Sequence, residues 1–80
     1  MVIEVELRLF ATLRGYLPAN PTGVEKVELP ENATVMDIVN KLGINFEEIR
    51  LILVNGVLNE ADYVLKDGDR VALFPPVGGG

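Results

Sequence analysis

The group in this sequence best suited to chemistry is the carboxylate that follows three consecutive glycines, Gly78-Gly79-Gly80. Glycine has no side chain, so this stretch of backbone is thin and adopts φ angles of either sign. Pro75 and Pro76, just before it, fix φ and remove two backbone donors. An extended chain from Pro75 to Gly80 spans roughly 20 Å at about 3.3 Å per residue. These residues predict a stiff exit followed by a loose tip that carries the carboxylate into the pocket of a partner protein.

The competing interpretation of this tail is a frayed terminus, because terminal residues are commonly disordered. Disordered tails usually carry Ser, Lys or Glu together with glycine, and residues 75–80 contain none of these. A functional tail is therefore favoured over a frayed one.

Composition excludes most catalytic chemistry in the chain itself. The sequence contains no cysteine and no histidine, which removes disulfides, thiolate metal sites, cysteine nucleophiles and imidazole acid–base catalysis. We expect no catalytic residues, no metal site and no bound cofactor. The net charge of −5 repels phosphate backbones, so nucleic acid is not an expected partner. An acidic surface suits a partner with a basic docking face, although solubility alone is the stronger explanation.

Length and hydropathy predict one small globular domain. Eighty residues leave no room for a second domain, and 49% hydrophobic residues argue against disorder. Apolar runs such as 51–54 are far too short to span a membrane. The first six residues lack the basic and apolar regions of a signal peptide. We expect a cytoplasmic protein without a membrane partner.

Period-two alternation and turn signals predict five strands. Residues 2–10 alternate, with Ile3, Val5, Leu7 and Leu9 on one side, which is typical of a half-buried strand. Further strands are expected at 24–29, 51–54, 57–58 and 70–74, and the continuous apolar run at 51–54 favours a central position. Asn-Gly at 55–56 predicts a type I′ hairpin turn, and Asp-Gly at 67–68 predicts another turn. A helical turn is expected at 11–14, closed by a glycine, a surface loop at 16–23, and a connector at 44–48 with room for a 3₁₀ turn.

One clear helix is predicted between the second and third strands. Thr34 is the expected N-cap, with Asp37 as its capping-box partner. An apolar stripe at spacings i, i+3, i+4 and i+7 would face a sheet; it consists of Val35, Ile38, Val39 and Leu42. Gly43 is the expected C-terminal cap.

The order of these elements predicts an α+β domain of two layers. A right-handed crossover lets the last strand pair parallel with the first. The expected fold is the β-grasp, or ubiquitin-like, fold: a mixed sheet of about five strands with one main helix on one face. Residues 1–74 form the domain, and residues 75–80 form a flexible tail.

Three blocks of sequence make the chain resemble the ubiquitin-like sulfur-carrier family, and within it the small subunit of molybdopterin synthase. They are Leu7-Arg8-Leu9-Phe10-Ala11-Thr12-Leu13-Arg14, Val54-Asn55-Gly56, and Asp67-Gly68-Asp69-Arg70-Val71-Ala72-Leu73-Phe74-Pro75-Pro76-Val77-Gly78-Gly79-Gly80. The resemblance spans the whole domain, and the terminal Phe-Pro-Pro-Val-x-Gly-Gly is its most specific part.

The resemblance implies a sulfur carrier rather than a catalyst. In that family an adenylyltransferase related to ubiquitin-activating enzymes uses ATP to adenylate the C-terminal carboxylate, here that of Gly80. Sulfur from a donor such as a cysteine desulfurase or rhodanese then gives a C-terminal thiocarboxylate. The loaded tail then enters the large synthase subunit and donates sulfur for molybdopterin; the carrier and this subunit form a heterotetramer. The tail here consists of Pro75, Pro76, Val77, Gly78 and Gly79. A chain without cysteine fits this role, because the sulfur is carried on the backbone terminus.

Four residues are docking candidates by the same resemblance. Phe74 and Leu58 would make apolar contacts with both partners, and Arg14 and Arg70 would pair with acidic residues on them. Phe74 fits the last core position of its strand equally well, and burial is slightly favoured for Leu58. For the two arginines, solvated charges without a function remain the favoured interpretation.

Alternative functions share the same tail. The sulfur could instead serve to form the thiazole of thiamine, to synthesise cysteine or methionine, or to build a tungsten cofactor. A Gly-Gly-Gly ending also occurs among thiazole-type carriers. The leucine–phenylalanine block at 9–14 and the Pro-Pro pair favour molybdopterin. A ubiquitin-like modifier that forms isopeptide bonds with lysines is a further alternative, and a plain binding module is disfavoured by the glycines.

Overall fold

The N-terminal half of the chain forms a hairpin whose inner residues alternate as predicted. The computed structural model describes residues 1–17, 20 and 22–76. Strand β1 (Val2–Leu9) pairs antiparallel with β2 (Val24–Pro30), from Val2 opposite Pro30 to Arg8 opposite Val24. Every second side chain of β1 is buried, from Ile3 to Leu9. This pattern follows from a pleated strand with one face against the core.

A 3₁₀ helix, η1 (Ala11–Tyr16), follows β1 and is longer than the single turn predicted. Tyr16, expected in a loop, is its last residue, and the Tyr16 hydroxyl donates a hydrogen bond to Glu48 Oε2 at 2.8 Å. Glu48 ends a second 3₁₀ helix, η2 (Phe46–Glu48), in the connector where such a turn was predicted. This hydrogen bond ties two segments that lie far apart in the sequence.

Helix α1 (Val35–Leu42) begins and ends where the sequence predicts. The Thr34 amide donates to Asp37 Oδ2 at 2.8 Å, and the Asp37 amide donates to Thr34 Oγ1 at 3.4 Å, which completes the capping box. Gly43 adopts a left-handed conformation with φ of 69° and closes the helix. The predicted apolar stripe faces the sheet, with Val35, Ile38 and Val39 buried.

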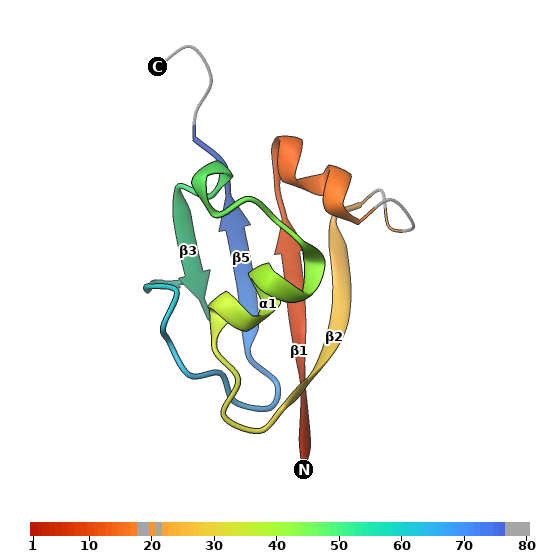
Figure 1. The fold of residues 1–80 in the computed structure, drawn as a ribbon, viewed down its shortest axis with the longest axis vertical. Helices are drawn as coiled ribbons and strands as arrows, with labels where there is room; N and C mark the ends of the chain where they lie inside the picture. Colours follow the sequence, from red (N-terminus) through yellow and green to blue (C-terminus); the bar gives the residue numbers. More distant parts are fainter. Residues whose placement is uncertain (18–19, 21, 77–80) are drawn as a thin grey trace.

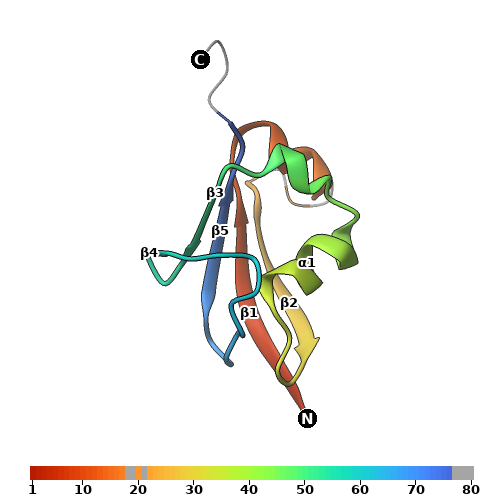
Figure 2. The same cartoon turned by 60° about the vertical axis from the view of Figure 1, so that its left-hand side comes forward.

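The remaining strands complete a mixed sheet of five strands (Figures 1 and 2). These are β3 (Leu51–Val54), β4 (Val57–Leu58) and β5 (Arg70–Phe74), and the order across the sheet is β2-β1-β5-β3-β4. Strand β5 runs parallel to β1, and the other pairs are antiparallel. The fold is the β-grasp fold with ubiquitin-like topology, as predicted. Asn55 and Gly56 both have positive φ, 53° and 81°, as the predicted hairpin turn requires.

The predicted central position of residues 51–54 is wrong. Strand β5 lies at the centre of the sheet, and β3 lies between it and the two-residue edge strand β4. The apolar run is not buried on both faces either, because Ile52 and Val54 are in the core whereas Leu51 is 43% exposed. Strand β3 alternates like the others, with Ile52 and Val54 facing the core and the apolar side chains of Leu51 and Leu53 on the opposite face.

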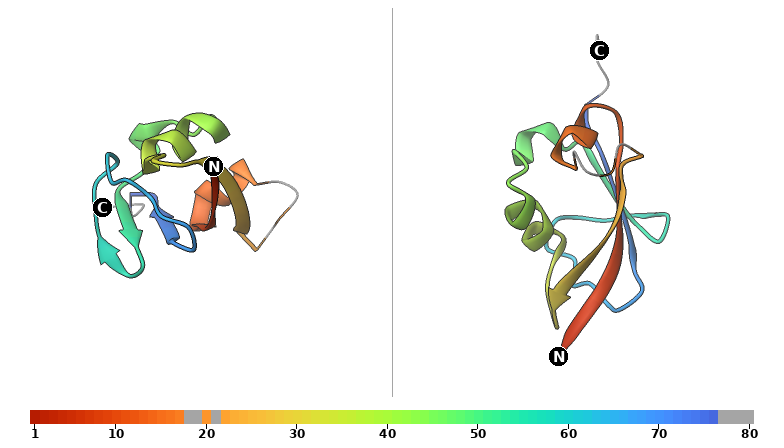
Figure 3. Two further views of the ribbon diagram at one scale, coloured as in Figure 1. Left: turned by 90° about the horizontal axis from the view of Figure 1, so that it is seen from below. Right: turned by 90° about the vertical axis from the view of Figure 1, so that its right-hand side faces the viewer.

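The core lies between the sheet and α1, and the opposite sheet face is uncovered by any helix within residues 1–17, 20 and 22–76 (Figure 3, right). We call this second surface the open face. Strand register and the pleat place on it side chains from all five strands; they are Val24, Lys26 and Glu28 of β2, Glu4, Glu6 and Arg8 of β1 followed by Phe10, Arg70, Ala72 and Phe74 of β5, Leu51 and Leu53 of β3, and Leu58 of β4. None of the helices in the described ranges is long and apolar enough to cross a membrane.

Candidate functional site

The tail leaves the domain from the central strand. Strand β5 is bonded to β1 on one side and to β3 on the other, and it ends at Phe74. Pro75 and Pro76 follow outside the sheet, because proline cannot donate to a ladder. Val77, Gly78, Gly79 and Gly80 lie outside the described residues, so the roles predicted for them remain predictions.

Phe74 lies on the open face rather than in the core. Its ring stacks on that of Phe10, with centroids 4.3 Å apart and planes inclined by 8°. The preceding residue, Leu73, is fully buried, whereas Phe74 is half-buried. Of the two alternatives that the sequence left open for Phe74, the structure therefore excludes the core position and leaves its aromatic ring available for contact.

An apolar hollow of about 360 Å³ lies at the base of the tail. Its walls come from the end of β1, the start of β3 and the exit from β5; they are Phe10, Ala11, Arg50, Leu51, Phe74, Pro75 and Pro76. The Arg50 amide donates to the Phe74 carbonyl at 2.7 Å and closes one side. This arrangement can accept an apolar side chain of a partner at the point where the tail departs.

Leu58 extends the apolar surface to the far edge of the sheet. It is 64% exposed and lies opposite Leu53 in the β3–β4 hairpin. The slight preference for burial was wrong, because β4 is an edge strand and its outer side is uncovered. With its neighbours it forms what we call the apolar patch, which consists of Phe10, Leu51, Leu53, Leu58, Ala72 and Phe74. Apolar surface that is contiguous and exposed in this way is typical of a protein–protein interaction site.

The two arginine candidates fall in different places. Arg70 is exposed on the open face and lines, with Arg8, a second hollow of about 260 Å³ beside the apolar patch. Arg14 lies in η1, with its side chain next to Gly23. It lines neither the hollow at the base of the tail nor the hollow beside the apolar patch, both formed by described residues. The structure thus groups Arg70 with Phe74 and Leu58 but does not bring Arg14 to the same surface.

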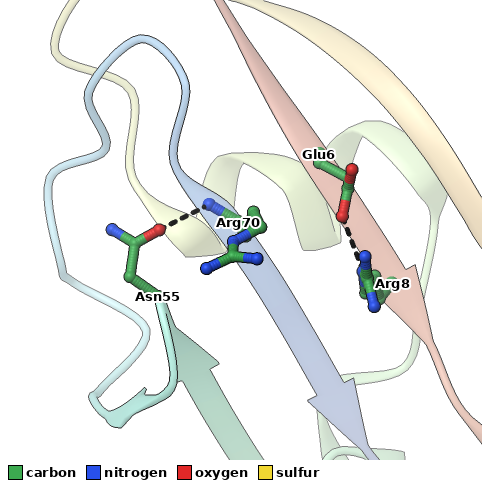
Figure 4. Close-up of polar contacts among 4 residues, drawn as sticks. All are labelled: Glu6, Arg8, Asn55 and Arg70. Atoms are coloured by element: carbon green, nitrogen blue, oxygen red, sulfur yellow. Dashed lines mark hydrogen bonds and ion pairs between the residues drawn. The ribbon is translucent and has the colours of Figure 1, made fainter.

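A small polar network fixes the backbone of Arg70. The Arg70 backbone N–H donates to Asn55 Oδ1 at 3.0 Å (Figure 4). The Asn55 backbone N–H donates to the Arg70 carbonyl at 2.8 Å. Asn55 Nδ2 in turn donates to the buried carboxylate of Asp69 at 2.9 Å, which also accepts from the Lys66 amide at 2.8 Å. These bonds attach the β3–β4 turn to the start of β5.

The sequence analysis missed four residues of the apolar patch: Phe10, Leu51, Leu53 and Ala72. The signal was present in the parity of the strands, because Phe10 follows the buried Leu9 and therefore points to the opposite face. For β3 the alternation of inward and outward side chains could not be seen in the sequence, because all four residues are apolar.

Within the part of the chain that the structure describes, no group of three or more acidic, histidine or cysteine side chains is placed to hold a metal ion.

Comparisons with known proteins identify the family of this chain. The model of the ThiS family matches residues 7–80, and no curated protein sequence matches the chain significantly. The Haloferax volcanii protein HVO 2177 has a similar structure, with a TM-score of 0.78 and 30% identity over 99% of this chain and 88% of that one. A Pyrococcus furiosus protein described as a candidate subunit 1 of molybdopterin converting factor gives a TM-score of 0.73 and 32% identity, over 94% of this chain and 99% of that one. SAMP1 from Haloferax volcanii gives 0.72 and 25% identity, over 96% and 99%. The family match covers more than half of the sequence and includes the final glycines, and the chain therefore belongs to the ThiS family of ubiquitin-like sulfur carriers.

Proposed function

We propose that this chain carries sulfur for the synthesis of molybdopterin, as a thiocarboxylate at Gly80. The observation that carries the proposal is the position of the apolar hollow, whose walls include Phe74 and the two prolines from which the tail departs. A partner that places an apolar side chain in this hollow holds the start of the tail at a fixed point. The remaining tail residues then reach a defined depth in a channel of that partner. The likeness to a candidate subunit 1 of molybdopterin converting factor supports this pathway.

The chemistry requires little of the carrier beyond an unhindered carbonyl carbon. A carboxylate is a poor electrophile, so an oxygen of Gly80 attacks the α-phosphorus of ATP, pyrophosphate leaves, and the acyl adenylate forms. The terminal sulfur of a partner's persulfide then attacks the carbonyl carbon and AMP leaves. A second thiol on the partner cleaves the sulfur–sulfur bond, which leaves the thiocarboxylate on Gly80 and a disulfide on the partner. A side chain at position 79 or 80 would crowd this carbon.

The proposal names three partners. The first is an adenylyltransferase related to ubiquitin-activating enzymes, which uses ATP that the carrier itself does not bind. The second is a sulfur donor such as a cysteine desulfurase or rhodanese. The third is the large subunit of molybdopterin synthase, with which the carrier forms a heterotetramer. The large subunit as a partner is supported by a complex of subunits 1 and 2 of the Helicobacter pylori molybdopterin-converting factor, one chain of which is 25% identical to this chain.

The test is intact-mass spectrometry after incubation with a molybdopterin-type activating enzyme, ATP and a sulfide source. The expected product has gained the mass difference between one sulfur and one oxygen, and fragmentation places it at Gly80. Transfer to the acceptor is then followed with the large subunit and cyclic pyranopterin monophosphate. Absence of any adenylate or thiocarboxylate would overturn the carrier role, and a loaded carrier that supplies no molybdopterin would move it to another sulfur pathway, such as thiazole synthesis.

A second candidate function is the modification of other proteins. The likeness to SAMP1, a small archaeal modifier protein whose structure is 25% identical in sequence, favours it. An activated Gly80 would then form an isopeptide bond with a lysine amine instead of accepting sulfur. Peptide mass spectrometry of cell extracts would show branched lysines bearing the C-terminal residues of this chain. Their loss on deletion of the activating enzyme would establish the modification, and the two functions are compatible.

A further inference from the structure

Strand β2 has a neighbouring strand on one side only. The strand order is β2-β1-β5-β3-β4, so β2 lies at one edge of the sheet (Figure 1) and β4 lies at the other. Strand β4 has two residues, whereas β2 has seven. Within the described part of the chain, no strand pairs with the outer side of β2. A long edge of this kind is a template for pairing with a further strand.

The hydrogen bonds between β1 and β2 identify the backbone groups of β2 that point outward. In an antiparallel pair, opposite residues alternate between those that exchange both backbone bonds and those that exchange none. The Leu9 N–H donates to the Gly23 carbonyl at 2.7 Å. At the other end, the Glu31 N–H donates to the Met1 carbonyl at 3.0 Å. The odd-numbered residues of β2 therefore bond to β1, and the backbone groups that point outward belong to Val24, Lys26, Glu28 and Pro30.

Two of these outward residues carry opposite charges that the chain itself leaves unmatched. Glu28 lies opposite Glu4 of β1, and like charges at directly opposite positions are destabilising. Lys26 lies opposite Glu6, but Glu6 Oε2 accepts a hydrogen bond from Arg8 Nε at 2.6 Å (Figure 4). Among residues 1–17, 20 and 22–76, neither Lys26 nor Glu28 forms a salt bridge. Each of the two therefore lacks the opposite charge that the other would supply.

One register lets a second β2 strand supply both charges. When two β2 strands pair antiparallel and the pair is centred on Val27, Lys26 of each copy lies opposite Glu28 of the other. A pair centred on Lys26 or on Glu28 would instead place two like charges directly opposite each other. Registers displaced further along the strand shorten the pairing. The sequence of β2 is thus complementary to itself in this one register.

The same register also satisfies the outward backbone groups. Lys26 and Glu28 both belong to the outward set, so each pair exchanges two backbone hydrogen bonds, and the two-fold symmetry makes four. At either end the Val24 N–H faces the carbonyl of Pro30. Proline has no N–H to donate, and in this register it lies at the end of the ladder rather than at its centre.

We propose that two copies of this chain pair through β2, antiparallel and centred on Val27, and form one continuous sheet. This inference goes beyond the proposed carrier function and does not depend on it. The observations that carry it are the direction of the backbone groups and the charges of Lys26 and Glu28. An interface in which the same patch of both copies is self-complementary is the usual basis of a two-fold dimer.

The geometry of such a dimer leaves the candidate functional site uncovered. The two-fold axis is perpendicular to the sheet, so both open faces lie on the same side. Strand β5 of one copy runs antiparallel to β5 of the other, and the two tails therefore leave at opposite ends of the dimer. The apolar patch lies at the end of β1 and on β5, β3 and β4, away from β2. Each copy remains able to bind a partner of its own.

The competing interpretation is an edge that is protected against pairing. Lysine and proline on an edge strand discourage contact with other strands, and β2 carries both in Lys26 and Pro30. Under that interpretation the chain stays monomeric at every concentration. The two interpretations differ because Glu28 lies in the position that turns the lysine from a deterrent into an attraction between copies.

The first test is sedimentation equilibrium of the full chain over a range of concentrations. The mass should rise from 8.7 kDa to twice that value as concentration increases, with weak association because a single strand pair buries a small area. Either Lys26→Glu or Glu28→Lys turns two attractive pairs into two repulsive ones and should raise the dissociation constant about tenfold. An equimolar mixture of the two variants should dimerise like the unaltered chain, because opposite charges then face each other at both pairs.

Lys41→Glu is the matched control. It makes the same change of charge as Lys26→Glu at an exposed position in the last turn of α1, and should change the dissociation constant less than about twofold because distant charges are screened. Thermal unfolding shows whether each variant is folded. The new carboxylate of Lys26→Glu also lies opposite Glu6 in its own sheet; if this variant is unstable, Lys26→Gln replaces it, with an expected rise of about threefold.

The second test follows the backbone of β2 by amide hydrogen exchange. In the monomer the N–H groups of Lys26 and Glu28 face solvent and should exchange rapidly, whereas the Val27 N–H bonds to β1 and should be protected. At concentrations that favour the dimer, the first two should become protected as well. Glu28→Lys should abolish this protection at Lys26 and leave that at Val27 unchanged.

Each outcome decides the proposal. An unaltered chain that stays monomeric at its highest soluble concentration would overturn it, and so would a dimer that both charge variants leave intact, since another surface would then form it. A mixture of the two variants that stays monomeric would exclude the register centred on Val27. The carrier function would stand in all three cases, because loading of Gly80 is measured separately.

Discussion

Phe10 and Phe74 stack face to face although they come from opposite ends of the domain. Their rings lie 4.3 Å apart because β1 and β5 run parallel, with Leu9 opposite Leu73, and each phenylalanine is the next residue. The two buried leucines point to the core and the two rings point to the open face. The parallel pairing of the first and last strands thus places an aromatic pair at the exit of the tail.

Phe74→Ala is expected to weaken partner binding while the domain remains folded. Loss of the stacked pair costs about 1 kcal/mol of the free energy of unfolding, whereas Leu73→Ala, which removes a fully buried side chain, costs about 3 kcal/mol. Urea unfolding of the two variants measures this difference. The affinity of Phe74→Ala for the activating enzyme should fall by more than about 1 kcal/mol. A loss of stability equal to that of Leu73→Ala would show that Phe74 belongs to the core.

Asn55→Ala is expected to destabilise the domain through two separate effects. Asn55 has φ of 53° and its side chain bonds both Arg70 and Asp69. The left-handed conformation costs alanine about 1 kcal/mol, and the lost hydrogen bonds cost about 1 kcal/mol more. Asn55→Gly keeps the conformation and loses only the bonds, so urea unfolding of both variants separates the two effects. Equal stability of the two variants would show that the conformation contributes nothing.

Gly23→Ala is expected to be the most destabilising change to alanine at a glycine. A Cβ at position 23 would lie 2.3 Å from the Leu9 carbonyl oxygen, and φ is +79°. The Leu9 amide donates to the Gly23 carbonyl at 2.7 Å, so the two backbones cannot separate without losing this bond. Strain and the lost bond together cost about 3 kcal/mol. Gly43→Ala is the control, because its Cβ would meet nothing within 4 Å and only the positive φ costs about 1 kcal/mol. A melting temperature of Gly23→Ala no lower than that of Gly43→Ala would contradict the close approach.

Deletion of Gly79 and Gly80 is expected to abolish activation without changing stability. The buried core residues of the described part of the chain all lie between Ile3 and Leu73, so the free energy of unfolding should be unaffected. The carboxylate would lie two residues short of the active site of the activating enzyme. Adenylate formation and urea unfolding, measured on the same preparation, test both parts. A large loss of stability would mean that the tail packs against the domain.

The elements with strong local signals were predictable from the sequence. The strand at 2–10 alternates, and the helix carries its capping box between Thr34 and Asp37, so both are specified by residues close in the chain. The β-grasp fold followed from the order of these elements. The position of β3 did not, because four apolar residues in a row fit either a buried central strand or a strand with an apolar interaction face.

The candidate site was less predictable because it depends on contacts between distant segments. The stacking of Phe10 on Phe74 needs the parallel register of β1 and β5. The exposure of Leu58 depends on the position of β4 at the edge of the sheet. The local sequence pattern does not indicate that position. The position of Glu6 between Lys26 and Arg70 likewise depends on the register of β1 with β2 and with β5.

The parallel pairing of β1 with β5 also determines how the domain responds to force. The chain enters β1 at one end of the sheet and leaves β5 at the other (Figure 1). Tension between the N-terminus and the tail therefore acts along both strands in opposite directions and loads their shared hydrogen bonds together, in shear. Bonds loaded together resist far more force than bonds that are peeled one at a time. A pull on the chain beyond Phe74, with the N-terminus held, would therefore have to break the β1–β5 hydrogen bonds together before β5 could leave the sheet.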